Sequence, residues 1–246
     1  MDLSNRTVLI VGGTSGIGLG LAQRLVAGGN TVIVGGRDTS KVDDIESVEI
    51  DVTDPDSVRR ARDAVLAAHP TLDVLVTMSG VMSMEDLRDP GHFVAAETTI
   101  AVNLVGTIRT IDAFTPHLLD RGTADIVTVS SGIAFLPFPL MPTYGASKAG
   151  IHAYTEALRA QLAGTGVAVT ELVPPAVATA GQEKVNPAAL PLENFLDEVI
   201  ALLAQTPTPN EIVVQAAQRL RWAERDGTYS SLLKDRSQSL NTLHQH

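Results

Sequence analysis

Short apolar runs alternate with longer amphipathic stretches along most of the chain. Several runs, such as Val8-Leu9-Ile10-Val11, are continuously apolar, which is typical of strands buried on both faces of a sheet. Alternating strands and helices predict right-handed βαβ crossovers and a parallel sheet. The predicted strands are Thr7–Val11, Thr31–Val34, Val48–Ile50, Asp73–Thr77, Asp125–Val129, Val167–Leu172 and Glu211–Val214. The predicted helices are Ile17–Ala27, Pro55–Ala68, a long region Phe93–Asp120, Thr143–Ala163 and Leu192–Ala204.

These elements predict one α/β domain over residues 1–246, a Rossmann-type doubly wound parallel sheet of about seven strands with helices on both faces. The length suits a single sizeable core. Segment 176–210 opens with Pro, Gly and small residues of weak periodicity and is expected to form a lid. Residues 215–246 are expected to form a surface helix and a frayed tail.

Helix boundaries are marked by familiar signals. Gly28-Gly29 is expected to end the first helix, and Thr53-Asp54-Pro55 to begin the second with capping residues before a first-turn proline. Pro116 lies inside the long helical region and is expected to kink or divide it.

Composition narrows the possible partners and compartments. A net charge of −10 disfavours nucleic acid as a partner, because phosphate binding needs a basic surface. No apolar run reaches the ~20 residues that span a bilayer, so no membrane association is expected. The start, Met1 to Asn5, lacks the basic region of a signal peptide, and the chain has no cysteine for disulfides or thiolate metal sites. We therefore expect a cytoplasmic protein.

No metal site is expected, because the histidines lack the i, i+4 or carboxylate-backed spacing of metal ligands. His152, one helical turn past Lys148, is the single histidine of interest and is expected to be a packing or surface residue. The six histidines are His69, His92, His117, His152, His244 and His246.

A glycine-rich turn directly follows the first predicted strand and opens a helix. Gly12, Gly16 and Gly18 are its glycines, and their spacing differs from the common G-x-G-x-x-G. Glycines let backbone N–H groups approach a pyrophosphate, and the helix N-terminus attracts the anion. The strand before it and the helix after it favour a dinucleotide site over an ordinary tight turn.

Arg37 follows the second strand, where proteins that prefer NAD usually carry an acidic residue. A guanidinium there suits a 2′-phosphate, which predicts NADP(H) as the preferred cofactor, with NAD(H) possible. The alternative is that Arg37 is a solvated loop charge.

Tyr144 and Lys148 lie one helical turn apart, and Ser131 precedes Tyr144 by 13 residues. Reduction of a ketone by hydride transfer leaves an alkoxide that needs a proton, and a phenol can supply it if its pKa of about 10 is lowered. The ammonium of Lys148 is expected to lower the pKa of Tyr144. The Ser131 hydroxyl could stabilise the charge that develops on the carbonyl oxygen.

Together these motifs resemble the short-chain dehydrogenase/reductase family from Thr7 to about Leu220, and most of all its DltE-like bacterial subgroup. The residues that carry the resemblance are Gly12, Gly16, Gly18, Asp51, Val52, Asn103, Ser131, Tyr144 and Lys148. The resemblance implies that Tyr144 is the acid/base, that Lys148 binds the nicotinamide ribose and lowers the tyrosine pKa, and that Ser131 orients the substrate carbonyl. It implies that Asn103 helps to hold a proton-relay water.

The resemblance also implies which residues bind the cofactor. Asp51 and Val52 would contact adenine, and the segment Val173–Thr179 would bind the carboxamide. The full expected set is Gly12, Thr14, Ser15, Gly16, Ile17, Gly18, Arg37, Asp51, Val52, Gly80, Tyr144, Lys148, Pro174, Val177 and Thr179. Family members commonly pair through the helices around Asn103 and Lys148, so a homodimer or homotetramer is expected.

Three positions depart from the family pattern, all on the cofactor side. They are Val11 before the first glycine, the turn Thr77-Met78-Ser79-Gly80, and Pro174-Pro175 in place of Pro-Gly.

The first interpretation of the protein's function is an NADP(H)-dependent ketoreductase. The alternatives are a non-redox biosynthetic enzyme such as a cyclase or dehydratase, and a cofactor-sensing binding protein. The apolar segment Ile133–Pro142 is open to three interpretations: a wall for a small hydrophobic carbonyl substrate, core, or a subunit contact.

Overall fold

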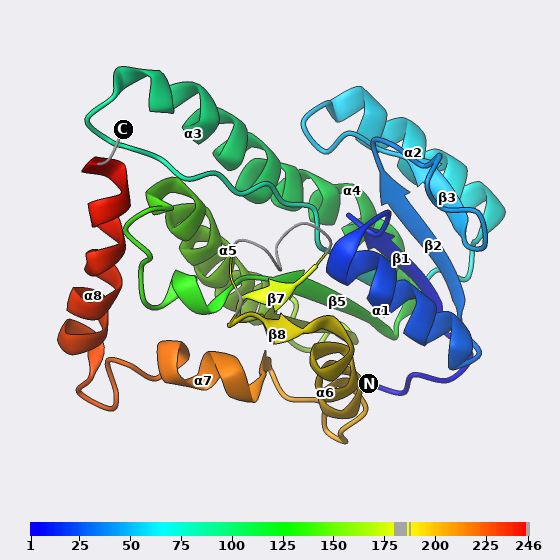
Figure 1. Cartoon of the computed structure of the whole chain (residues 1–246). Coiled ribbons are helices and arrows are strands. Elements are labelled where there is room, and N and C mark those ends of the chain that lie inside the picture. The colour runs from blue at the N-terminus through cyan, green and yellow to red at the C-terminus, as the bar shows by residue number, and fades with distance from the viewer. Residues whose placement is uncertain (180–185, 187, 245–246) are drawn as a thin grey trace.

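A seven-stranded parallel sheet forms the centre of the molecule in the computed structural model, which describes residues 1–179, 186 and 188–244 (Figure 1). The predicted Rossmann-type α/β fold is confirmed, and each predicted strand is present with ends shifted by a residue or two. The strands of the sheet are β1 Thr7–Val11, β2 Thr31–Gly36, β3 Glu46–Glu49, β4 Val74–Thr77, β5 Ala124–Val129, β6 Val167–Val173 and β9 Glu211–Val213.

The strand order is β3-β2-β1-β4-β5-β6-β9, and every neighbouring pair is parallel. The chain builds outward from β1 to β3, then crosses back to place β4 on the other side of β1. This reversal opens a crevice at the carboxyl ends of β1 and β4, where ligands bind in folds of this type. The glycine turn follows β1, and the Thr77–Gly80 turn completes β4.

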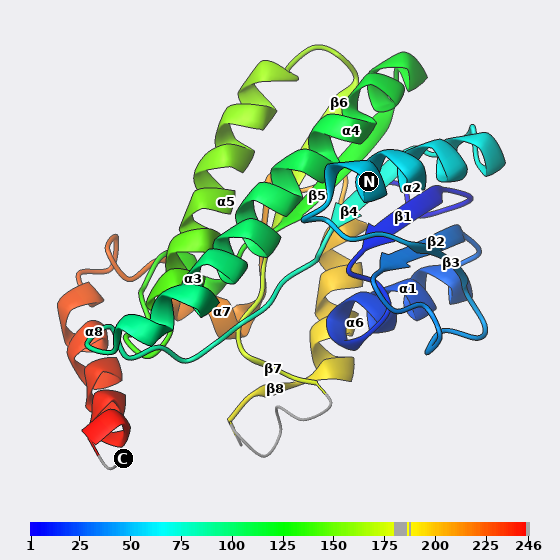
Figure 2. The same cartoon turned by 90° about the horizontal axis from the view of Figure 1, so that it is seen from above.

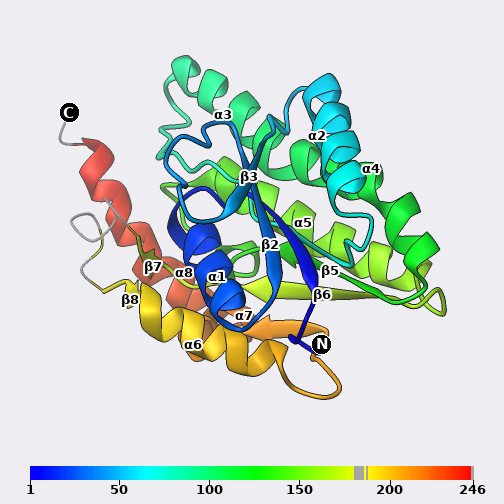
Figure 3. The same ribbon diagram turned by 90° about the vertical axis from the view of Figure 1, so that its right-hand side faces the viewer.

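Helices cover both faces of the sheet, as Figures 2 and 3 show. Side chains alternate along β1, so that Val8 and Ile10 pack with α1 and α6, while Leu9 and Val11 face the core beneath α2, α4 and α5. The continuous apolar run is thus explained by burial on both sides. The helices are α1 Gly16–Ala27, α2 Pro55–Ala68, α3 Phe93–Ile100, α4 Gly106–Arg121, α5 Pro142–Gln161, α6 Leu192–Leu203, α7 Gln215–Arg221 and α8 Tyr229–Ser237.

Two of the predicted helix boundaries follow their local signals. Helix α1 ends where Gly29 adopts a φ of +82° and donates its N–H to Val26 O. Helix α2 begins with Asp54, whose side chain accepts from the N–H of Asp56, and has Pro55 in its first turn.

The prediction that Pro116 kinks or divides the long helical region is wrong about the place of the division. Pro116 lies inside the continuous helix α4. The irregularity comes earlier, in a π-helical turn at Ala101–Val105 between α3 and α4. This turn contains Asn103, and such turns occur frequently at functional sites.

The predicted lid is only partly described. Strand β7, Val177–Ala178, pairs with β8, Leu190–Pro191, and α6 follows directly. The other predicted lid residues 180–185 and 187 lie outside the described residues, as do 245–246 of the expected tail.

The expectation of one C-terminal surface helix is wrong. Helices α7 and α8 and a 3₁₀ segment, Gln238–His244, occupy this region. Ala223 and Leu232 are buried there against Leu136, which lies between Ser131 and Tyr144. The C-terminal helices therefore pack on the segment Ile133–Pro142, and Leu136 and Leu140 of that segment are core residues.

Within the described chain, none of the helices combines the length and hydropathy needed to span a bilayer.

Arg6 joins the amino ends of three neighbouring strands, opposite the crevice. Its Nε lies 2.7 Å from Asp73 Oδ2, and its Nη2 lies 2.7 Å from Asp125 Oδ2. Asp73 also accepts from the N–H of Thr7 at 3.0 Å. The carboxylates therefore share one largely buried guanidinium between them.

We expect Arg6→Met to lower the free energy of unfolding by about 2 kcal/mol or more, because it leaves two facing, poorly solvated carboxylates without a counter-charge. Urea denaturation measures the change. Arg59→Met is the matched control: Arg59 pairs with Asp56 on the exposed surface of α2, and its loss should change stability by no more than about 0.5 kcal/mol. Equal effects of the two changes would show that the Arg6 network does not hold the strands.

Candidate active site

The glycine turn packs backbone against backbone. Gly12 has a φ of +91°, and a Cβ at this position would lie 2.4 Å from Ser79 N. A Cβ on Gly18 would lie 2.2 Å from Gly12 O. The N–H of Gly12 donates to Gly35 O at 2.7 Å. These contacts require glycine at both positions and fix the N-terminus of α1 next to the end of β4.

The start of α1 offers unpaired donors to an anion. Ser15 is the N-cap residue, but its side chain makes no capping hydrogen bond. The first N–H groups of a helix lack intrahelical partners and carry the positive end of the helix dipole. A pyrophosphate group placed here would satisfy them.

Predicted cofactor residues from separate segments gather around this turn. A Cβ on Gly16 would lie 3.5 Å from Thr179 Cγ2, and a Cβ on Gly36 would lie 2.6 Å from Thr14 Oγ1. Ile17 packs against the core cluster beneath α1 and α6, which also includes Val177. The structure therefore brings together the ends of β1, β2 and β7.

Arg37, Asp51 and Val52 lie at the ends of β2 and β3. Two hydrogen bonds from Thr53 lower the pKa of Asp51, and the charges of Arg37 and Arg109 act in the same direction. Val52 is buried, and its carbonyl accepts from Arg109. Arg37 is exposed, with no hydrogen bond or ion pair among the described residues. Its guanidinium is therefore available to a ligand.

Asn103 anchors the turn after β4. Its Oδ1 accepts from the N–H of Val81 at 2.8 Å, and its Nδ2 donates to Val81 O at 2.9 Å. Gly80 lies between Asn103 and Lys148, because a Cβ there would be 3.5 Å from Asn103 Oδ1 and 3.9 Å from Lys148 Nζ. The Asn103 side chain thus positions the turn, and its expected part in holding a water stays a prediction.

Pro174 places the end of β6 beside Ser131. Pro174 O accepts from the N–H of Gly132 at 2.9 Å, and the Ser131 side chain accepts from the N–H of Ile133 at 3.4 Å. Ser131 is the N-cap of a 3₁₀ turn, Gly132–Ala134. A hydrogen bond also links Ser131 with Tyr144.

The pKa of Tyr144 shifts opposite to the expected direction in the protein alone. Burial raises it to about 12, and the hydrogen bond with Ser131 offsets only part of that rise. Lys148 Nζ lies 5.7 Å from the centre of the tyrosine ring. The expected lowering by Lys148 is therefore not found at this distance, and Tyr144 is a protonated phenol at neutral pH.

Lys148 is a buried ammonium with a single protein acceptor among the described residues. Its Nζ donates to Val129 O at 2.8 Å, and burial lowers its pKa to about 8. An ammonium has three donors, so two remain for a bound ligand. Burial of this charge is unfavourable without such a partner.

The sequence did not reveal two residues that position helix α5, which carries Tyr144 and Lys148. Ser147 donates to Tyr144 O at 2.7 Å and accepts from Asn103 Nδ2 at 3.1 Å, linking α5 to the π-helical turn. Glu85 is buried and accepts from Thr143 N at 3.1 Å and Thr143 Oγ1 at 2.7 Å, one residue before Tyr144. The helix dipole favours a carboxylate there. Ser147 directly precedes Lys148 in the sequence, whereas no sequence pattern pointed to Glu85.

The prediction that every histidine lacks a carboxylate at metal-ligand spacing is wrong for His152. His152 and Glu156 are four residues apart on α5, and His152 Nδ1 lies 2.8 Å from Glu171 Oε2. That hydrogen bond raises the pKa of His152. The side chain is half-buried and packs edge-on against Phe135.

Comparison with known proteins agrees with this geometry. The model of the short chain dehydrogenase family matches residues 6–190. The chain belongs to this family. This short-chain dehydrogenase is similar to the uncharacterized oxidoreductase DltE of Bacillus subtilis. The two sequences are 37% identical over 193 residues, and the aligned region covers 75% of this chain and 76% of that protein. An uncharacterized oxidoreductase of Staphylococcus saprophyticus is 30% identical over 191 residues, covering 73% and 81%.

Solved structures extend the likeness to the whole fold of this short-chain dehydrogenase. A short chain dehydrogenase from Burkholderia cenocepacia, in complex with NADP, superposes with a TM-score of 0.83 at 26% identity, covering 95% of this chain and 99% of that one. One from Streptomyces avermitilis, at 24% identity and a TM-score of 0.81 over 97% and 99% of the two chains, shares the fold.

The buried ammonium of this dehydrogenase predicts an unusual pH dependence of stability. The pKa of Lys148 is about 8 in the folded protein and 10.5 for an ordinary lysine, so the unfolded state binds the additional proton. Stability from this group therefore rises with pH between these values. We expect Lys148→Met to be more stable than wild type at about pH 7 without cofactor, and the difference to shrink towards about pH 10.

Urea denaturation of the cofactor-free proteins at several pH values measures this difference. Lys41→Met is the matched control, because Lys41 is exposed and its loss should give no such trend. A wild type that is the more stable at neutral pH, or a difference independent of pH, would contradict the assignment of a strained buried charge to Lys148.

Proposed function

We propose that the protein is an NADP(H)-dependent oxidoreductase of the ketoreductase type, which interconverts a carbonyl and an alcohol on a small apolar substrate. The observation that carries the proposal is the placement of Ser131, Tyr144 and Lys148 beside the glycine turn. Three groups with the chemistry needed to bind and protonate a carbonyl oxygen thus adjoin a cradle for an anionic dinucleotide.

The residues present fit a nicotinamide cofactor. Gly12 and Gly18 allow the close backbone packing that sets the N-terminus of α1 at the end of β1, and the N–H groups of that helix end suit the pyrophosphate. Lys148 has two donors for ribose hydroxyls, and Arg37 is available for a 2′-phosphate. The bound cofactor would supply or accept the hydride. The NADP complex of the Burkholderia relative supports the same choice.

The chain's own residues would bind the carbonyl and deliver the proton. The Ser131 hydroxyl donates to the carbonyl oxygen and stabilises the negative charge that grows there. The Tyr144 hydroxyl, which is protonated at neutral pH, gives its proton to that oxygen as the negative charge grows there. In the reverse direction the phenolate takes the proton from the alcohol, which is favoured at higher pH.

The intact Ser131, Tyr144 and Lys148 set favours turnover over a cofactor-sensing protein or a non-redox enzyme. Incubation with NADPH and a panel of ketones and aldehydes, followed by the absorbance of the reduced nicotinamide, tests this. Oxidation of NADPH with any of them supports the proposal. A protein that binds NADPH tightly and oxidises it with none of a broad panel would favour the binding alternative.

A homodimer or homotetramer in the cytoplasm belongs to the same proposal. Val94 and Val105 lie on the α3–α4 region and are exposed to 72% and 41%. Apolar side chains in such a position suit contact with a second copy of the chain.

We expect Tyr144→Phe to reduce carbonyl turnover by roughly 10²–10⁴-fold while leaving cofactor affinity nearly unchanged, because only the transferable proton is removed. Steady-state kinetics and a cofactor titration measure the two quantities. Tyr154→Phe, a half-buried tyrosine on the same helix, is the control and should retain full activity. Turnover of Tyr144→Phe within about threefold of wild type would exclude Tyr144 as the acid.

We expect Arg37→Ala to weaken NADPH binding by about 10- to 100-fold and NADH binding far less. A charge-assisted contact to the 2′-phosphate contributes about 1.5–3 kcal/mol, and 1.4 kcal/mol corresponds to a factor of ten. Calorimetric titration of both cofactors measures this. Lys41→Ala removes an exposed charge from the same loop region as a control. Equal losses for the two cofactors would show that Arg37 only supports the loop.

A further inference from the structure

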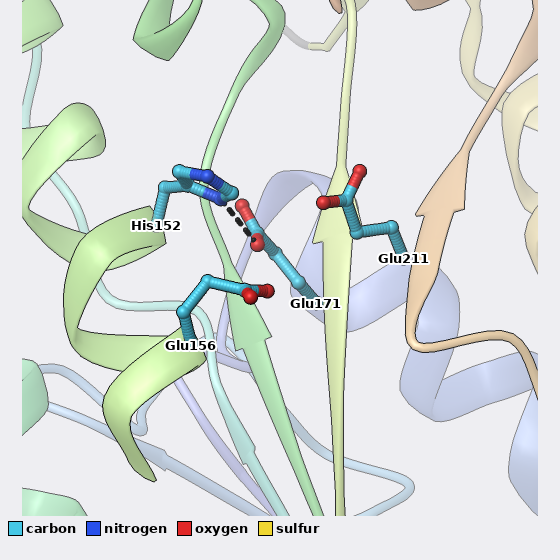
Figure 4. Close-up of side chains that lie close together, drawn as sticks. All are labelled: His152, Glu156, Glu171 and Glu211. Carbon is cyan, nitrogen blue, oxygen red and sulfur yellow. Dashed lines mark hydrogen bonds and ion pairs between the residues drawn. The ribbon is translucent and has the colours of Figure 1, made fainter. Parts of the chain in front are cut away.

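A second group of polar side chains lies further along the catalytic helix. His152 and Glu156 follow Lys148 on α5 at successive turns, Glu171 belongs to β6, and Glu211 to β9. Figure 4 shows the four side chains pointing into one space between these elements. One nitrogen or oxygen atom from each lies within 4.8 Å of the others.

Glu171 is the buried member of this cluster and lacks full hydrogen bonding. Its side chain is 0% exposed. Oε2 contacts His152 Nδ1 at 2.8 Å, whereas Oε1 is buried and has no hydrogen-bond partner in the part of the chain that the structure describes. A buried carboxylate oxygen without a partner is costly, so a group that supplies positive charge at Oε1 is expected.

The neighbouring arginines do not meet this need. Arg221 makes two contacts with Glu211, at 2.7 and 2.8 Å, and Arg159 pairs with Glu156. Among the described residues, neither arginine makes a hydrogen bond to Glu171 Oε1. The outer carboxylates thus have hydrogen-bonded cations of their own, whereas Glu171, which Arg221 influences only through its charge, has a hydrogen bond with the imidazole alone among the described residues.

We propose that His152, Glu156, Glu171 and Glu211 bind one divalent transition-metal cation such as Zn²⁺ or Mn²⁺. One imidazole nitrogen with carboxylate oxygens is a ligand set that suits these ions, whereas Mg²⁺ and Ca²⁺ prefer oxygen alone. Ligands at 2.0–2.2 Å on opposite sides of an ion lie about 4.2 Å apart, close to the observed spread. Glu156 is exposed and can move inward to close the difference.

The ion would have a structural effect on the catalytic helix. It would join α5 to β6 and β9 through side chains, one turn beyond Lys148. The imidazole is already held by Phe135, at 4.7 Å between ring centres, and Arg221 lies 4.2 Å from the centre of that phenylalanine ring. Metal binding to the folded state alone must raise thermal stability.

The test is calorimetric titration of chelator-treated, full-length protein with Zn²⁺ and with Mn²⁺, together with thermal unfolding at each metal concentration. We expect one ion per chain and a higher Tm with metal. Glu171→Gln should weaken binding about tenfold or more, as should Glu156→Gln, which changes an exposed side chain and does not threaten folding.

Two controls separate this site from other metal ligands. Glu46→Gln removes the carboxylate of an exposed pair in which His69 Nε2 lies 2.8 Å from Glu46 Oε1, the same separation as in the His152 pair. Replacement of His244 and His246 by alanine removes the histidines at the C-terminal end of the sequence. Both should leave the affinity unchanged. Absence of binding, or affinity that survives both Glu171→Gln and Glu156→Gln, would overturn the proposal.

Discussion

The approach of two backbones at the carboxyl ends of β1 and β4 determines the rest of the site. Gly12 passes so close to Ser79 that no side chain fits between them. This contact brings the N-terminus of α1 next to the turn Thr77–Gly80, and Asn103 then holds that turn from the other side. The departure from the usual family sequence in this turn leaves the arrangement in place, because it depends on backbone atoms and on Gly80.

The site is built from groups that are unfavourable in the protein alone. Lys148 is a buried cation with one acceptor within the described ranges of the chain, and burial raises the pKa of Tyr144. Such groups are common where a ligand is to be bound, since the ligand supplies the missing partners. The apolar cores on both faces of the sheet and the Arg6 network at its opposite end stabilise the fold, and so offset the unfavourable free energy of burying Lys148.

Features marked by local chemistry could be predicted from the sequence. Continuous apolar runs located the strands, Gly29 and Asp54 marked helix ends, and the glycine turn marked the cofactor end. The predicted kink or division at Pro116 was misplaced because a proline can be accommodated inside a helix whose neighbours are well packed. The π-helical turn that contains Asn103 has no local signature in the sequence. Glu85 and Glu171 escaped notice because their roles depend on contacts across the fold, with Thr143 and His152 respectively. Long-range pairings of this kind leave no periodic trace.

The C-terminal helices lie beyond the part of the chain matched by the family model, yet Leu232 and Ala223 pack on the segment that joins Ser131 to Tyr144. The segment between Ser131 and Tyr144 and its outer support are therefore encoded in separate stretches of sequence. A change at Leu232 or Ala223 would therefore reach the segment between Ser131 and Tyr144 through its packing on Leu136.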